Sequence, residues 1–134
     1  MSAQENLALY TALPYISVVV KPLISVIETS PYLADANRLL SEEERIRVVD
    51  LLAADPEAGD LIRGGGGVRK VRIPMAGRGK RGGGRVIYYF HSRIMPVFLL
   101  AMFAKNERDD LSDADVRVLA KAVKSYAKQF GGSS

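Results

Sequence analysis

Apolar positions recur with a helical period in the first half of the chain, after one short extended stretch. Residues 23–28 (LISVIE) are few and largely β-branched, which predicts a strand. Apolar side chains then follow helical spacing as far as Leu40, and Ser30-Pro31 is typical of an N-cap followed by proline at the first helical position. We therefore expect a strand and then a first helix.

A second helix is expected to follow almost at once. Ser41 and Glu44 have the spacing of a capping box, and Asp55-Pro56 should end the helix because the residue before a proline avoids the helical region. The expected buried stripe is Ile46, Val49, Leu52 and Ala53. Two helices joined this closely predict an antiparallel hairpin.

From Val68 onward the pattern changes to a period of two, and we expect strands at about 68–73, 85–91 and 94–104. The last two are close enough to pair as a hairpin through His91–Arg93. The third is apolar on both faces, as a central strand is. Ser112 should cap a last helix that stops at Gly131, with an apolar stripe of Val116, Leu119, Ala120, Val123, Tyr126, Ala127 and Phe130.

These elements give the order β-α-α-β-β-β-α, which predicts an α+β domain with an antiparallel-dominated sheet. At 134 residues the chain is expected to form one domain over residues 23–130, with an N-terminal extension (1–22) and a flexible tail (131–134). The apolar run at 7–20 is too short to span a membrane, and Glu5 without nearby Lys or Arg argues against a signal peptide.

The composition excludes several kinds of site. The chain has no cysteine and one histidine, so a disulfide framework and a thiolate zinc site are excluded, and we expect no metal and no cofactor. A cysteine-free chain suits the cytoplasm.

The distribution of charge along the chain is more informative than the composition. The net charge is only +4, yet residues 61–104 contain nine Lys or Arg and no acid, while the rest of the chain carries fifteen acids against ten bases. Seven of these cations lie in residues 68–89 (VRKVRIPMAGRGKRGGGRVIYY). One segment is therefore strongly cationic, which favours a polyanionic partner.

Two nucleotide-binding motifs do not fit this stretch. Gly77 to Gly82 matches G-x-G-x-x-G, but it leads into a predicted strand and not into a helix, so a dinucleotide site is disfavoured. Gly79-Lys80 is followed by Arg81, where a phosphate-binding loop of the Walker type requires Ser or Thr.

Strand alternation gives a more specific expectation. Lys70 and Arg72 should point to one face of their strand, and Arg85 and Tyr89 to one face of the next. The glycine-rich connection carries Arg78, Lys80 and Arg81 beside them, and Lys105 could complete the group. Cations with an aromatic ring suit single-stranded nucleic acid, which offers phosphates and stacking bases. The alternative is that these residues are ordinary solvated charges.

Three stretches carry a resemblance to a known family: DPEAGDLIRGGGGVRKVR, GRGKRGGGRVIYYFH and FAKNERDDLSDAD. They resemble toxins of the RelE/ParE superfamily from bacterial toxin–antitoxin pairs, closest to the HigB-like branch. The resemblance extends from about Ile24 to Val123, and the element order predicted above is similar to that of the superfamily, which implies a RelE-like fold.

The resemblance implies an endoribonuclease that inhibits translation by cutting mRNA in the ribosomal A site without a metal ion or another cofactor. The implied partners are a cognate helix-turn-helix antitoxin, mRNA and the ribosome, with operator DNA bound only through the antitoxin and no membrane. By position, catalytic roles are implied for Lys70, Arg72, Arg85 and Lys105, while Tyr89 is chosen from strand alternation. The candidate RNA-binding residues are Arg69, Arg78, Lys80, Arg81 and His91.

In such a cleavage the 2′-hydroxyl attacks its own phosphate, so the protein mainly positions the RNA and stabilises charge. Arg72 and Arg85 would hold the phosphate oxygens, and Lys70 or Lys105 is a candidate base. Two rivals stay open: a ParE-like toxin that inhibits DNA gyrase, and a non-catalytic RNA-binding module of the same fold.

Overall fold

The computed structural model describes residues 23–76, 83–108 and 110–130. The expected extension (1–22), part of the glycine-rich connection (77–82) and the expected tail (131–134) lie outside these residues. The described elements, in chain order, are β1 (Val26–Glu28), α2 (Ser30–Leu39), α3 (Glu42–Ala54), β2 (Asp60–Leu61), β3 (Val68–Ile73), β4 (Gly84–Tyr89), β5 (Val97–Ala104) and α4 (Asp113–Phe130).

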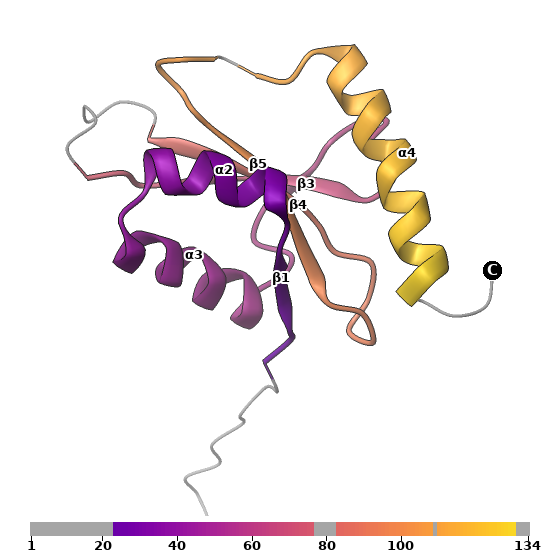
Figure 1. Cartoon of the computed structure of the whole chain (residues 1–134). Helices are drawn as coiled ribbons and strands as arrows, with labels where there is room; N and C mark the ends of the chain where they lie inside the picture. Colours follow the sequence, from indigo (N-terminus) through magenta and orange to yellow (C-terminus); the bar gives the residue numbers. More distant parts are fainter. Residues whose placement is uncertain (1–22, 77–82, 109, 131–134) are drawn as a thin grey trace, which may run out of the picture.

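The strands form a mixed sheet in the order β1-β5-β4-β3-β2. β1 runs parallel to β5, and the other pairs are antiparallel. The helical pair α2 and α3 lies on one side of the sheet and α4 on the other (Figure 1). The predicted α+β class and the predicted order are confirmed, with the two-residue strand β2 as an addition that the sequence pattern did not reveal.

The helix starts follow local capping chemistry. At α3 the capping box is present: Ser41 Oγ accepts from the Glu44 N–H at 3.1 Å, and Glu44 Oε1 accepts from the Ser41 N–H at 2.9 Å. The predicted cap of α2 was wrong by one residue, because Thr29 is the N-cap and Ser30 is already helical. The predicted stripe of α3 was also partly wrong. Ile46 is 53% exposed, and the stripe buried against the sheet contains Val48, Leu52 and Ala53.

β4 and β5 pair as predicted, but their ends differ. β4 stops at Tyr89 and β5 begins at Val97, so the connection is longer than His91–Arg93. The pairing shifts between Ile87 and Tyr88, which face Ala101 and Leu99, so that Leu100 is the extra residue of a β-bulge. The shift turns Leu100 and Ala101 toward the same side, where both belong to the α4-facing apolar cluster.

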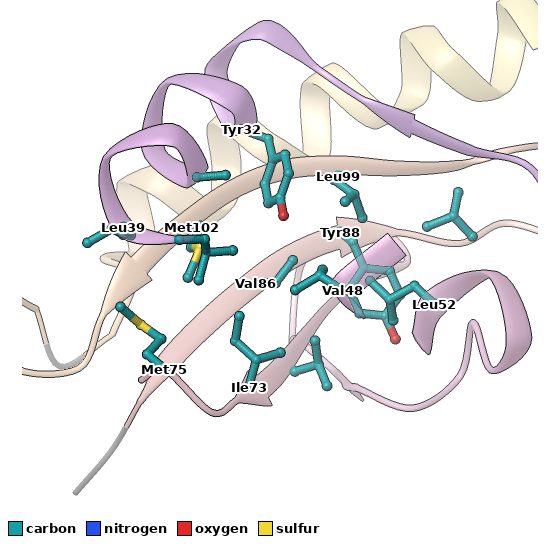
Figure 2. Packing of buried hydrophobic residues seen from close by; sticks show 14 of the residues in the cluster. Tyr32, Leu39, Val48, Leu52, Ile73, Met75, Val86, Tyr88, Leu99 and Met102 are labelled. Carbon is teal, nitrogen blue, oxygen red and sulfur yellow. The ribbon is translucent and has the colours of Figure 1, made fainter. Parts of the chain in front are cut away.

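The larger core lies between the sheet and the helical pair. Figure 2 shows Tyr32 and Leu39 of α2, Val48 and Leu52 of α3 and sheet residues such as Val86 and Leu99 gathered there. The hydroxyl of Tyr88 also connects this core to the chain after α3, because it donates to the Pro56 carbonyl and accepts from the Gly59 N–H, each at 2.8 Å.

A smaller core lies under α4. Ser112 caps this helix as predicted, with its Oγ accepting from the Asp115 N–H at 3.1 Å. Phe98 stacks on Tyr126 with ring centroids 4.5 Å apart, and Val123 is buried. Phe130, at the end of the predicted stripe, is 47% exposed, and its ring packs edge-on against Phe98 with the ring centroids 5.2 Å apart. Among the helices of the described residues, none has the length and apolar character that crossing a bilayer requires.

Candidate nucleic-acid interface

The side of the sheet that faces α4 changes from apolar to cationic along the strands. The strand pairing arranges it in three rows across β3, β4 and β5: Val68–Tyr89–Phe98, Lys70–Ile87–Ala101 and Arg72–Arg85–Phe103. The first row and Ile87 pack under α4. The cations gather toward one end of the sheet, and directly after β5 the Lys105 N–H donates to the Gly83 carbonyl and the Arg108 N–H to the Ala104 carbonyl at the same end. We call this set the basic end: Lys70, Arg72, Arg85, Lys105 and Arg108.

Arg72 and Arg85 are direct neighbours across the β3–β4 pair, as strand alternation predicted. Their surroundings differ. Arg72 is exposed and makes no ion pair with a described residue, whereas Arg85 is only 8% exposed and its Nη1 donates to the Gly84 carbonyl at 3.2 Å. The chain reaches this position through Gly83, whose φ of +50° and closeness to the Ile73 carbonyl leave no room for a Cβ. One arginine is thus held in place while the other is accessible.

Lys70 shares this face but has a partner. Its Nζ lies 2.9 Å from both carboxylate oxygens of Asp110, and Asp110 Oδ1 also accepts from the Leu111 N–H at 2.8 Å. The hydrogen bond from Lys70 lowers the pKa of the Asp110 carboxyl, and the nearby positive charge of Lys105 lowers it further. The cationic segment itself contains no acid, but Lys70 has an acidic partner because the segment after β5 brings Asp110 back across the sheet.

Arg108 is a member of the basic end that sequence reasoning missed. Its guanidinium carbon lies 5.8 Å from the centroid of the Phe103 ring, and it makes an ion pair with Asp115. Its Nε also donates to the Asp110 carbonyl at 3.1 Å. Arg108 lies in an acid-rich stretch (NERDDLSDAD), so the sequence pattern does not mark it as part of a cationic surface. The guanidinium covers the end of the third row as a flat cationic surface.

Tyr89 lies on the predicted face, but it is not available there as a stacking ring. The side chain is 3% exposed and belongs to the apolar row under α4, and this burial raises the pKa of its hydroxyl. Strand alternation gave the correct side of the sheet, whereas it could not show that α4 covers that end.

Two further candidates lie away from the basic end. Arg69 points to the opposite face of β3, next to Tyr88 in the pairing, and its Nη1 donates to the Gly59 carbonyl at 2.7 Å. His91 is exposed beyond the far end of β4, where its Nδ1 lies 3.2 Å from Ser92 Oγ. The other candidates, Arg78, Lys80 and Arg81, lie outside the described residues.

A hollow of about 380 Å³ next to Lys70 is poorly suited to phosphate. It opens between β2, β3 and the start of α4, and its charged lining consists of Asp60, Arg63, Lys70, Asp110 and Asp113. Acids outnumber bases in this lining, so the hollow does not favour an anion. In the described ranges no three His, Asp or Glu side chains are grouped in a way that could hold a metal ion.

The fold and the cationic face of the sheet together indicate a class of protein. A small mixed sheet with a helical pair on one side, one helix on the other and arginines paired across its central strands is consistent with the RelE-like fold. The family model described as the RelE toxin of the RelE/RelB toxin–antitoxin system matches residues 38–131, which is more than half of the chain. The chain belongs to this toxin family, and membership implies an antitoxin as its partner.

Proposed function

We propose that this toxin is a metal-independent endoribonuclease of the HigB-like branch that cuts mRNA in the ribosomal A site. The observation that carries the proposal is the direct pairing of Arg72 with Arg85 on one face of the sheet. Two guanidinium groups on neighbouring strands can bind the oxygens of one phosphate from two directions. A toxin directed only against a protein has no need of such a pair.

The proposed reaction needs few groups from the protein. The 2′-hydroxyl of the RNA attacks the adjacent phosphorus, the bond to the 5′-oxygen breaks, and a 2′,3′-cyclic phosphate remains. Negative charge grows on the phosphate oxygens as the five-coordinate state forms. Arg85 is already fixed by its burial, and Arg72 is free to meet the incoming RNA, so both can stabilise that charge with little rearrangement.

The surroundings of Lys70 change its expected role. The ion pair with Asp110 holds the Lys70 ammonium group in place on this face of the sheet, and the hydrogen bond from Lys70 lowers the pKa of the Asp110 carboxyl. We therefore assign Lys70 as a cation that holds phosphate or donates a proton to the leaving 5′-oxygen, and leave Lys105 as the candidate base. Asp110 must give up Lys70 when a phosphate arrives, since carboxylate and phosphate compete for the same ammonium group.

In the cell we expect a helix-turn-helix antitoxin to inhibit the toxin by covering the basic end or by blocking access to the ribosome. Operator DNA would be contacted through the antitoxin, and the complex would act in the cytoplasm. Two rival functions predict other outcomes. A ParE-like gyrase inhibitor would block DNA supercoiling, and a non-catalytic module would bind RNA without producing cut ends.

The decisive experiment compares Arg72→Ala with Arg93→Ala in primer extension on ribosome-bound mRNA. Both side chains are exposed and carry the same charge, but Arg93 lies in the connection between β4 and β5, at the far end of the sheet. We expect Arg72→Ala to slow cleavage by about 10²–10³-fold, the usual cost of removing one donor to a developing oxyanion. Arg93→Ala should cleave like the unchanged protein. A folded Arg72→Ala protein that cuts at the full rate would refute the proposal.

A further inference from the structure

A second cationic surface lies on α4, apart from the basic end. Arg117, Lys121, Lys124 and Lys128 are all exposed, and their spacing of four, three and four residues repeats on one side of the helix. At 3.6 residues per turn they fall within a sector of about 60°. We call this set the α4 stripe.

Neutralising groups are scarce around the α4 stripe. None of its four side chains makes an ion pair with a residue in the described part of the chain. The acids of the helix are confined to its first turn, at Asp113 and Asp115, and no Asp or Glu follows from Val116 to Phe130. The stretches that the structure does not describe contribute only two acidic side chains, Glu5 and Asp109. The stripe therefore produces a positive potential with little internal compensation.

Packing of α4 does not require these charges. The helix buries Val123 and half-buries its neighbours Leu119 and Ala127, which face the sheet, and the stripe lies on another side of the helix. Exposed Gln would serve helix formation almost equally well, since Lys, Arg and Gln have similar helix propensities. The regular placement of four cations is thus not explained by the stability of the helix.

The chemistry of the stripe favours phosphates over an acidic protein. Its sector contains no apolar side chain, and three of its four members are lysines, a residue that is depleted in protein–protein interfaces but common in contacts to nucleic-acid backbones. From Arg117 to Lys128 the stripe extends about 16 Å at 1.5 Å per residue. A nucleic-acid duplex carries roughly one charge per 1.7 Å of its axis, so a stripe of this length faces several phosphates.

The stripe is separate from the basic end but begins near it. Val116, next to Arg117, lines the same hollow as Lys70, and the helix then continues toward the opposite end of the sheet, where Tyr126 meets Phe98. A duplex on the stripe and a single strand at Arg72 and Arg85 could therefore be bound at the same time. We propose that the α4 stripe is a second RNA-binding surface, which docks on the phosphate backbone of structured, double-stranded RNA independently of cleavage.

The test measures binding of a blunt 16-base-pair RNA duplex to the full-length protein by fluorescence anisotropy at several salt concentrations. The variant is Lys121→Gln with Lys124→Gln. The control is Arg47→Gln with Arg93→Gln, which removes the same charge from exposed residues elsewhere. We expect the variant to lose about tenfold in affinity and to reduce the slope of log K against log salt by about 1–2. The control should keep most of its affinity and most of its salt dependence. Far-UV circular dichroism and thermal unfolding should be unchanged in both proteins.

Equal binding by the variant and the control would overturn the proposal. So would competition by polyglutamate as strong as that by the duplex, because the stripe would then be a surface for an acidic protein. Arg72→Ala separates this proposal from the nuclease proposal, since it should slow cleavage by about 10²–10³-fold and leave duplex binding unchanged. If Arg72→Ala cuts mRNA at the full rate, the nuclease proposal fails while the result for the stripe stands.

Discussion

The two sides of the sheet are closed to different degrees. Under α2 and α3 one apolar core extends over the whole length of β3, from the level of Tyr88 through Val71 to Ile73. Under α4 the apolar core ends at Ile87 on β4 and Phe103 on β5, and the rest of the third row presents Arg72 and Arg85. The helical-pair side is closed from end to end, and the α4 side is closed only in part.

Because of this difference, we expect the residues that stabilise the fold and the residues that bind RNA to lie on different sides of the sheet. The apolar side chains on the closed side are mostly buried in one cluster, so shortening them creates cavities. At the basic end, the guanidinium groups of Arg72 and Arg85 lie opposite each other on adjacent strands, and a pair of like charges in this position contributes nothing favourable to the stability of the sheet. Stability is therefore expected to depend mainly on the helical-pair side and RNA cleavage on the open end, and each part of that comparison can be tested.

The largest effect is expected in the core of the closed side. Leu52→Ala removes a fully buried side chain and should lower the free energy of unfolding by about 2–5 kcal/mol. Leu119→Ala, in the half-buried stripe of α4, should cost about 1 kcal/mol, and Arg72→Ala about 0.5 kcal/mol or less. Urea denaturation of the three variants gives the comparison directly. Equal losses for Leu52→Ala and Leu119→Ala would show that the two sides do not differ.

Two buried tyrosines refine the comparison within the closed side. Tyr88→Phe removes the hydroxyl that bonds Pro56 and Gly59, and should cost about 1–3 kcal/mol because both backbone groups lose their partner. Tyr32→Phe is the matched control. Its hydroxyl is buried without a hydrogen-bond partner in the described residues, and burial raises its pKa to about 12. Its removal should leave thermal unfolding unchanged or stabilise the protein by up to about 1 kcal/mol.

At the basic end, the ion pair of Lys70 with Asp110 predicts that removal of the carboxylate raises the affinity for RNA. Asp110→Asn removes the carboxylate that competes with phosphate, so binding of single-stranded RNA should tighten by about 3–10-fold, or up to about 1.4 kcal/mol. Asp113→Asn is the control, because Asp113 lines the same hollow and loses the same charge. Filter binding at one fixed salt concentration is sufficient. Equal binding by both variants would show that Asp110 does not occupy the phosphate position.

The smallest effect is a pH dependence at the start of α3. Hydrogen bonds from the Ser41 N–H and then the Ala76 N–H lower the pKa of Glu44 from its ordinary 4.5. A folded-state pKa below the unfolded value stabilises the protein above pH 4.5, and this stabilisation is lost as the pH falls through the folded value. Glu44→Gln should therefore be less stable at pH 7 by up to about 1 kcal/mol. The difference should shrink below pH 4.5 in denaturation curves, and a constant difference down to pH 3 would contradict the assignment.

Much of the secondary structure and of the strand orientation could be predicted from the sequence. Helix caps and strand alternation are local, with periods of a few residues, so the capping box at Ser41 and the shared face of Lys70, Arg72 and Arg85 were predicted correctly. The opposite orientation of Arg69 follows from the same alternation. The short strand β2 was missed because two exposed residues carry no pattern.

Tertiary structure decided which of these residues are accessible and which are paired. Asp110 reaches Lys70 from forty positions away, and α4 covers Tyr89 but not Arg72. Neither fact follows from alternation, because both depend on where the chain crosses the sheet after β5. The sequence alone determined the order of the elements and the face on which the cations lie. The position of α4 decided where that face is open, since burial and ion pairing depend on contacts between segments that are distant along the chain.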